Sequence, residues 1–340
     1  MPVSNYRDLV RSGQLLHLDE YDHIIVSYSG GKDSLALALF MLEHADATHE
    51  KIELWHQHVD GEPGGTGLMD WPCTESYCRA TAKGLNLPLL FQWKHGGFEG
   101  EMLRNNSRTQ GVSYQTIGGD TKYLPPAIRG KLSTRRLFPQ VSADLSVRWC
   151  SAYLKIDVAR RAINNDERFK NSKILFLTGE RRQESTARSK YNEAEEHACS
   201  GTKRRVDQWR AIIDWTEEDV WNIIRRHNIR AHVAYYLGWG RVSCMACIFG
   251  DRDQWASVRS IAADRFNKIA GYETEFGKTI KKGESIIAQA DRGNSFVENV
   301  PDHLIKLAMS KDYPQDQVFF GPNEEWEPPV GAYKRCGGPA

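Results

Sequence analysis

The sequence predicts an α/β fold: a doubly wound, five-stranded parallel sheet followed by a helical C-terminal part. Two observations lead to this class. Short apolar runs alternate with segments of helical pattern, which is typical of a parallel sheet covered by helices on both faces. The first apolar run also passes without a break into a glycine-containing loop and then into an apolar helix, the order found where such sheets bind ligands.

Five apolar runs are expected to form the sheet: residues 23–27, 51–59, 87–93, 173–178 and 210–213. The expected helices are residues 35–42, 74–83, 152–163 and 217–227. From about residue 96 to residue 147 the pattern weakens, and Pro125-Pro126 with scattered glycines predicts a long excursion. We therefore expect an α/β domain over residues 1–230, which contains the excursion at about 96–147. A region with a cysteine pair and further helices is expected over residues 231–340.

Composition limits the class of protein. The 340 residues carry a formal net charge of +1, so binding of nucleic acid would have to come from a local patch. No run of about 18 apolar residues is present, and the first residues lack the apolar core of a signal peptide. We therefore expect no membrane span and a cytoplasmic location. In a reducing compartment, the seven cysteines predict thiols, metal ligands or nucleophiles rather than a disulfide framework.

The loop Ser29-Gly30-Gly31-Lys32-Asp33-Ser34 has the composition of an anion site. Its two glycines let the main chain approach an anion, and the helix that follows adds unpaired N–H donors. Ser29 and Ser34 add hydroxyl donors and Lys32 adds a cation, while Asp33 suits an N-cap or a carboxylate near Mg²⁺. The glycine spacing differs from that of a Walker A loop. The alternative is a plain turn followed by a capped helix.

This loop resembles the pyrophosphate loop, or PP-loop, of the family that contains the N-type ATP pyrophosphatases and the phosphoadenylylsulfate (PAPS) reductases. Further segments resemble motifs of that family, in the family's order: Arg148-Trp149-Cys150 followed by Leu154-Lys155, Gly179-Glu180-Arg181-Arg182-Gln183-Glu184-Ser185, Trp215-Thr216-Glu217-Glu218-Asp219-Val220-Trp221, and Cys244-Met245-Ala246-Cys247. Each motif alone is of modest specificity, but the ordered set spans residues 23–250. The resemblance implies an adenine nucleotide alpha hydrolase-like fold, with a PP-loop nucleotide-binding domain over residues 1–230.

The second of these motifs follows the fourth predicted strand, so its loop should open at the carboxyl edge of the sheet. Arg181 can clamp a phosphate with its planar guanidinium, and Glu184 can hold a metal or orient an arginine. Arg182 and Arg188 are interpreted as solvated charges. Asp60, after the second strand, suits a contact with ribose or metal, or a turn. The residues expected to bind the nucleotide are Ser29, Gly30, Gly31, Lys32, Asp33, Ser34, Asp60, Arg181, Glu184 and Ser185, with Lys32, Asp33 and Arg181 as the catalytic residues.

Cys244 and Cys247 have the spacing of a metal site, an iron–sulfur cluster or a redox dithiol. With Cys150 they make three ligands, a set that resembles the 4Fe–4S sites of tRNA-thiolating relatives; three ordinary buried thiols are the alternative. We expect the three to converge near the nucleotide phosphates. Cys336 lies in a C-terminal segment where reductases of the family carry a nucleophilic cysteine, although Arg335 stands here in place of their glutamate.

The resemblance implies an ATP pyrophosphatase that uses ATP and Mg²⁺. Such an enzyme cleaves between the α- and β-phosphates and adenylates an acceptor, which sulfur then attacks. The implied acceptor is DNA in a phosphorothioation system, with a cysteine desulfurase as partner. Basic residues of the excursion could follow a DNA backbone, with a solvated surface as the alternative: Arg104, Arg108, Lys122, Arg129, Lys131, Arg135 and Arg136. Two other functions compete: a PAPS or adenylylsulfate reductase that uses Cys336, and a non-catalytic nucleotide-binding subunit.

Overall fold

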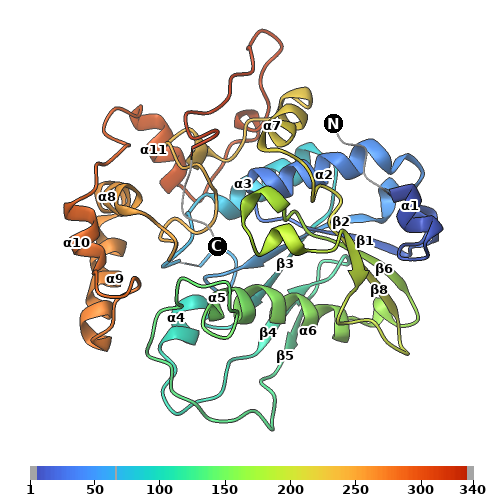
Figure 1. The fold of residues 1–340 in the computed structure, drawn as a ribbon, viewed down its shortest axis with the longest axis horizontal. Helices are drawn as coiled ribbons and strands as arrows, with labels where there is room; N and C mark the ends of the chain where they lie inside the picture. Colours follow the sequence, from blue (N-terminus) through green and yellow to red (C-terminus); the bar gives the residue numbers. More distant parts are fainter. Residues whose placement is uncertain (1–5, 66, 335–340) are drawn as a thin grey trace.

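The computed structural model describes residues 6–65 and 67–334 of the chain. Its centre is an eight-stranded sheet in the order β5-β4-β3-β2-β1-β6-β8-β7 (Figure 1). The strands β3, β2, β1, β6 and β8 run parallel, and β4, β5 and β7 continue the sheet antiparallel at its two edges. The strands are β1 (His23–Ser27), β2 (Ile52–His58), β3 (Leu89–Lys94), β4 (Val112–Gln115), β5 (Thr121–Leu124), β6 (Lys173–Leu177), β7 (Ala194–Glu196) and β8 (Arg205–Trp209).

The predicted doubly wound sheet with five parallel strands is confirmed, but the position of the fifth strand is wrong. This strand, β8, ends at Trp209 instead of starting at residue 210. The apolar run Ala211-Ile212-Ile213 is buried, as a strand would be. It forms a turn, however, in which the Ile213 N–H donates to the Arg210 carbonyl at 3.0 Å. A short apolar run does not by itself distinguish a strand from a buried turn.

The excursion holds more regular structure than its sequence pattern indicates. The helix α4 (Gly97–Met102) opens it, and β4 and β5 form a hairpin that extends the sheet beyond β3. The hairpin turn is closed by the Thr116 N–H, which donates to the Asp120 carbonyl at 2.8 Å. Its strands have four residues each, too few to show a clear two-residue period in the sequence.

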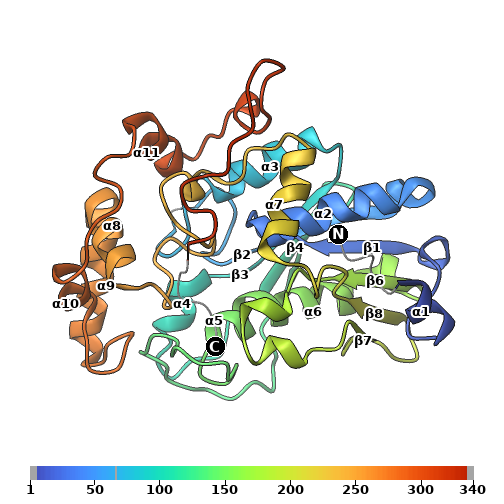
Figure 2. The ribbon, with the colours of Figure 1, turned by 45° about the horizontal axis from the view of Figure 1, so that its top comes forward.

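Helices cover both faces of the sheet. α2, α3 and α7 lie on one face and α6 on the other (Figures 1 and 2). In the central strand, the buried Ile24 and Val26 point into the core on the α2 side, whereas Ile25 points into the core on the α6 side, as the two-residue period of a strand requires. Besides α4, the α-helices are α1 (Tyr6–Arg11), α2 (Lys32–His44), α3 (Thr74–Gly84), α5 (Trp149–Ser151), α6 (Asp157–Asn165), α7 (Glu217–Arg226), α8 (Arg252–Ile261), α9 (Ala263–Phe276), α10 (Ile286–Asp291) and α11 (Asp302–Met309).

The predicted helical C-terminal part consists of α8 to α11, which flank one end of the sheet, at the left of Figure 1. Within it, α8 packs against α9 and α10. The division of the chain near residue 230 stays a prediction. One irregular element lies next to the site described below: α5 leads into α6 through a π-helical turn at Ala152–Ile156. In the described part of the chain, no helix combines the length and apolarity needed to cross a membrane.

Candidate nucleotide site and cysteine-lined cavity

β1 lies where the order of the strands reverses: β2 and β3 follow on one side of it, β6 and β8 on the other. Such a switch point places the loops after the two neighbouring strands side by side at the carboxyl edge of the sheet. A Cβ added to Gly179, after β6, would lie 3.1 Å from the carbonyl oxygen of Asp33, after β1. The topology of the sheet therefore brings two of the motifs into contact.

The loop after β1 turns sharply into α2. Gly30 has a φ of 80°, in the left-handed region that residues with a side chain rarely adopt. Ser34 closes the turn: its hydroxyl accepts the Ser29 N–H at 3.1 Å and donates to the Gly31 carbonyl at 2.9 Å. The two serines therefore fix the shape of the loop through their own contacts.

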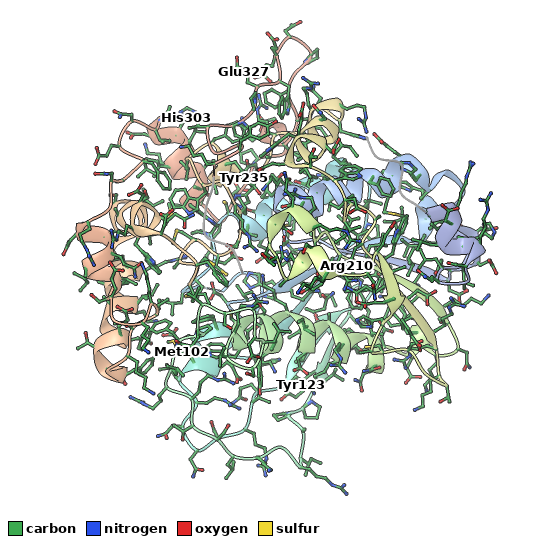
Figure 3. The ribbon with its side chains drawn as sticks, viewed as in Figure 1. Met102, Tyr123, Arg210, Tyr235, His303 and Glu327 are labelled. Atoms are coloured by element: carbon green, nitrogen blue, oxygen red, sulfur yellow. The ribbon has the colours of Figure 1, made fainter. Side chains whose placement is uncertain are left out.

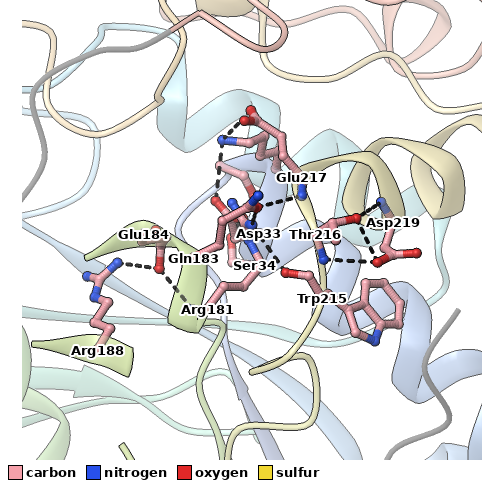
Figure 4. Close-up of polar contacts among 12 residues, drawn as sticks. Asp33, Ser34, Arg181, Gln183, Glu184, Arg188, Trp215, Thr216, Glu217 and Asp219 are labelled. Atoms are coloured by element: carbon pink, nitrogen blue, oxygen red, sulfur yellow. Dashed lines mark hydrogen bonds and ion pairs between the residues drawn. The ribbon is translucent and has the colours of Figure 1, made fainter. Parts of the chain in front are cut away.

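Asp33 is not the N-cap of this helix, so that interpretation is wrong: α2 begins at Lys32, with Gly31 as its N-cap. The Asp33 carboxylate is drawn instead to the Arg181 guanidinium, with 2.6 Å between Oδ1 and Nε. Its other oxygen lies 3.6 Å from the Lys32 ammonium, which also lies 3.4 Å from the Glu217 carboxylate. Two cations and two carboxylates thus meet from three segments of the chain (Figure 4).

The buried charges of this network stabilise one another. Burial disfavours the Lys32 cation, but Asp33, Tyr235 and Glu217 outweigh burial and raise the pKa of Lys32. Burial also opposes ionisation of Asp33, yet the neighbouring Lys32 and Arg181 lower its pKa. At neutral pH, Lys32 is therefore a cation and Asp33 an anion.

Arg181 is held in place by further contacts. Its Nη1 donates to the side-chain oxygen of Gln183 at 2.9 Å and to the Trp215 carbonyl at 3.3 Å. The same Gln183 oxygen accepts the Glu217 N–H at 2.9 Å. The second and third family-like motifs therefore converge on one guanidinium, and Arg181 is only 4 % exposed.

Glu184 and Arg188 form an ion pair beside this network (Figure 4). Glu184 also accepts the Arg181 N–H at 2.9 Å, so of its two expected roles it has that of orienting arginines. The interpretation of Arg188 as a solvated charge is wrong, because Glu184 holds it inward and its side chain is 17 % exposed. The Ser185 hydroxyl accepts the Arg188 N–H at 3.2 Å. Arg182 is partly buried too and donates to main-chain carbonyls of the following loop.

A cavity of about 480 Å³ opens at the carboxyl ends of β1, β2, β6 and β8, a size within the range of small-molecule sites. Among the residues described, its lining contains one carboxylate, that of Glu180, and six basic side chains: Arg148, Lys155, Arg160, Arg188, Arg210 and Arg241. Arg188 and Arg210 are paired with carboxylates. The other four have no carboxylate within 4.0 Å in the described part of the chain. Unpaired positive charge in a concave site attracts anions.

His197, which also lines the cavity, responds to this charge. Burial, followed by the neighbouring Arg160, lowers the pKa of His197 to about 4. Arg210, labelled in Figure 3, follows the last residue of β8 and adds to the same effect. The cavity therefore disfavours a further cation, and an anionic ligand fits it.

Cys150, Cys244 and Cys247 line this cavity together. Burial, and after it the proximity of Cys247, raises the pKa of Cys150. Burial raises the pKa of Cys244 well above its usual value. Within the residues that the structure describes, no three His, Cys, Asp or Glu side chains lie close enough to hold a metal ion. The three cysteines therefore share a cavity, but in this arrangement they do not present the ligands of a cluster.

Asp60 lies apart from this cavity and lines a second one of about 310 Å³. Its carboxylate accepts the N–H groups of Met69 and Asp70, at 3.0 and 2.7 Å. Of the roles considered for Asp60, the geometry supports that of a turn residue. The turn orders a loop whose Met69 carbonyl accepts the Ala246 N–H at 3.0 Å, so this loop contacts the segment between Cys244 and Cys247.

The basic residues of the excursion do not form one free surface. Arg104 and Arg135 are largely buried, and both bind Glu101, at 3.1 and 2.9 Å. Arg136 pairs with Glu275. For Arg104 and Arg135 the expectation of a surface that follows a DNA backbone is wrong, because both are largely buried against Glu101. For Arg136, whose side chain is 40 % exposed, it stays a prediction. The exposed basic residues of the excursion are Arg108, Lys122, Arg129 and Lys131.

Several site residues carry no clear signal in the sequence. Arg148 and Lys155 belong to the motif that contains Cys150, but nothing in the sequence separates their charges from those of surface residues. Arg160, Arg210 and Arg241 belong to no motif. These basic residues come from segments that are far apart in the sequence, and only the fold brings them together around one cavity. Cys336 lies outside the described residues.

Comparisons with known proteins find similarity over part of the chain. Residues 130–249 match the family model of the phosphoadenosine phosphosulfate reductase domain. An uncharacterized 37.8 kDa protein of Escherichia phage 186 is 31 % identical over 148 residues, which are 44 % of this chain and 42 % of that protein. An adenosine 5'-phosphosulfate reductase of Neisseria meningitidis serogroup A is 35 % identical over 72 residues, which are 21 % of this chain and 28 % of the reductase.

The chain thus covers less than half of the length of these relatives. Among solved structures, a Candida glabrata FMN adenylyltransferase is 11 % identical, with 88 % of this chain and 85 % of that chain covered and a TM-score of 0.40, too low to carry an argument. The matched stretches are therefore similar to the phosphoadenosine phosphosulfate reductase domain and to adenosine 5'-phosphosulfate reductases, which supports a nucleotide-utilising enzyme.

Proposed function

We propose that this protein is an ATP pyrophosphatase that activates an acceptor for incorporation of sulfur. The observation that carries the proposal is the contact of residues 29–34 with Arg181 at the switch point of the sheet, beside a strongly basic cavity. A nucleoside triphosphate needs N–H donors at the start of a helix, fixed cations and a concave space for the nucleoside. All three are present within one edge of the sheet.

The residues fit ATP as follows. The loop amides would bind the β- and γ-phosphates, while Lys32 and Arg181 would neutralise the pyrophosphate as it leaves. Mg²⁺, when bound, would supply further neutralisation of the phosphates, with Asp33 as its nearest carboxylate in the loop. An acceptor oxygen would attack the α-phosphorus, the bond to the bridging oxygen would break, and pyrophosphate would leave. A sulfur nucleophile would then attack the adenylated acceptor and displace AMP.

We further propose DNA as the acceptor and a cysteine desulfurase as the source of sulfur. The outer sulfur of its persulfide would attack the adenylated phosphate and displace AMP. A dithiol reductant would then cleave the resulting S–S bond, which leaves the sulfur on the DNA and oxidises the dithiol to a disulfide. The resemblance to phosphorothioation proteins motivates this choice, and the three thiols that line the basic cavity support it. No step is assigned to an iron–sulfur cluster, since the cysteines do not present a metal site.

The test is a product analysis with ATP, Mg²⁺, duplex DNA, a sulfur-loaded cysteine desulfurase and a dithiol reductant. We expect AMP and pyrophosphate in equal amounts, with sulfur appearing in the DNA. Orthophosphate as the only product would contradict the proposal. ATP binding with no product under these conditions would identify a non-catalytic nucleotide-binding subunit instead.

A second function, reduction of adenylylsulfate or PAPS with Cys336 as the nucleophile, is favoured by the path of the C-terminal chain. The Gly331 N–H donates to the Tyr235 carbonyl at 2.8 Å, and a side chain at Gly240 would collide with the Lys334 carbonyl. Lys334 stands two residues before Cys336 in the sequence. Release of sulfite from either sulfonucleotide with a dithiol reductant, lost in Cys336→Ser and without any pyrophosphate from ATP, would replace the first proposal by this one.

A further inference from the structure

Tyr235 connects the pyrophosphate loop to the segment that leads into the cysteine pair. It ends the short 3₁₀ helix Val233–Tyr235 and is 1 % exposed (labelled in Figure 3). Its hydroxyl oxygen accepts the main-chain N–H of Lys32 at 2.9 Å and that of Val242 at 3.3 Å. One phenol oxygen thus joins the first residue of α2 to a residue only two positions before Cys244.

The Lys32 N–H is one of the donors with which a helix start binds an anion. In this structure a neutral hydroxyl oxygen takes it. The Lys32 side chain binds the same segment, because its ammonium donates to the Gly240 carbonyl at 3.4 Å. A Cβ added to Gly31 would lie 3.0 Å from the Val242 carbonyl oxygen. Residues 235–242 therefore cover the loop and use donors that a pyrophosphate group would require.

The end of this segment and the residues that follow it form part of the wall of the cavity. Arg241, Ser243, Cys244 and Cys247 all line it. On its other side the segment is held by the C-terminal chain, through the Gly331 N–H that donates to the Tyr235 carbonyl. A shift of Val242 away from the loop is consequently passed on to Cys244 through two peptide units, and to Cys247 three residues further along the chain.

We propose that Tyr235 is a positioning residue that couples occupation of the pyrophosphate loop to the placement of Cys244 and Cys247. An anion that takes the Lys32 N–H and ammonium releases the Tyr235 hydroxyl and the Gly240 carbonyl, and the cavity wall moves. The inference rests on the proposed function to the extent that the loop binds phosphate groups. Because coupling between two sites is reciprocal, alkylation of the cysteines changes the affinity of the loop for pyrophosphate.

The test uses the full chain and inorganic pyrophosphate with Mg²⁺ as the probe. Alkylation of each cysteine is followed by mass spectrometry of its peptide, with and without the probe, while calorimetry measures binding. In the native protein we expect the rates at Cys244 and Cys247 to change roughly fivefold, the lower end of common coupling strengths. The rate at the buried Cys199, which belongs to the core on the other face of the sheet, should stay constant.

Tyr235→Phe removes the hydroxyl and keeps the ring, which packs edge-to-face on Trp221 at 5.2 Å. We expect this variant to bind pyrophosphate and to show no change in cysteine alkylation on binding. Tyr236→Phe is the matched control, because no hydrogen bond joins the Tyr236 hydroxyl to the loop in the described chain, and it should behave as the native protein does.

Each outcome decides one claim. Binding of pyrophosphate to the native protein without a change at either cysteine overturns the coupling and leaves the proposed function standing. A Tyr235→Phe variant that keeps the full change overturns the role of Tyr235. Absence of binding to the native protein overturns the loop as a phosphate site, and with it both the proposed function and the coupling.

Discussion

The two halves of the candidate site treat charge in opposite ways. At the loop of residues 29–34, the Lys32 and Arg181 cations meet the Asp33 and Glu217 carboxylates within 3.6 Å. In the wall of the neighbouring cavity, Arg148, Lys155, Arg160 and Arg241 have no carboxylate within 4.0 Å among the described residues. The loop is charge-balanced by the protein itself, whereas the wall carries a surplus of positive charge.

This difference indicates what each half is for. A buried, balanced network holds its geometry before any ligand arrives, and removal of one member leaves another charge buried without a partner. A wall of unpaired cations contributes little to stability and gains most when an anion binds. We therefore expect variants of the loop to cost stability as well as activity, and variants of the wall to cost affinity for anions alone.

The largest effect is expected at Arg181. Arg181→Gln should lower the free energy of unfolding by about 3–5 kcal/mol, because the buried Asp33 carboxylate loses its guanidinium partner. Urea unfolding measures this. Arg182→Gln, one residue along and partly exposed, is the control and should cost less than about 1 kcal/mol. Equal losses in the two variants would contradict a structural role for the Asp33 pair.

Lys32 comes next, and here the readout is catalysis. Lys32→Met should reduce release of pyrophosphate from ATP at least about 100-fold, the typical result of removing one fixed donor from a developing anion. Circular dichroism should show an unchanged fold, and the exposed Lys83→Met serves as control. Near-native activity of Lys32→Met would show that the loop binds no phosphate.

The two halves should also differ in their response to pH. The pKa of His197 in the wall is lowered to about 4, so this residue is neutral in the folded protein where the unfolded chain, with a pKa of about 6.5, binds a proton. Its contribution is present above about pH 6.5 and is lost as the pH falls towards 4, by at most roughly 3 kcal/mol. The pKa of Asp33 is lowered as well, so its contribution is lost only below the ordinary carboxyl pKa of about 3.9.

Urea unfolding of the native protein and of His197→Gln between pH 7.5 and pH 4.5 isolates the histidine. The native protein should lose its advantage over the variant within this window, and Asp33 should contribute no change in it. A constant difference between the two proteins across the window would mean that His197 does not titrate as the basic wall requires.

The smallest effect on stability is expected at Arg241. Arg241→Gln should leave the free energy of unfolding within about 0.5 kcal/mol of the native value, because no ion pair is broken. Its affinity for pyrophosphate should fall about tenfold, or about 1.4 kcal/mol, measured by calorimetry. If Arg241→Gln proved as destabilising as Arg181→Gln, the contrast between loop and wall would be lost.

The sequence predicts the loop and its strand well because their signal is local. Residues 29–34 stand between an apolar strand and an apolar helix, and both the turn at Gly30 and the helix after it need only near neighbours. Asp33 binds Arg181, which is 148 residues away in the sequence. The residues around Asp33 do not reveal this contact, and they are equally compatible with a helix cap. The six basic side chains of the cavity are likewise brought together by the fold from four separate segments, around residues 148–160, 188, 210 and 241.

The π-helical turn at Ala152–Ile156 decides which residues share a face of this helix. In an uninterrupted α-helix, Cys150 would stand one turn below Leu154, a side chain 1 % exposed in the core on the α2 side. The π turn takes in one more residue than an α turn, and Cys150 and Lys155, five positions apart, both line the cavity. The turn works as a one-residue spacer: a relative that lacks that residue can keep the helix and its hydrophobic seam, and still present a different side chain to whatever binds there.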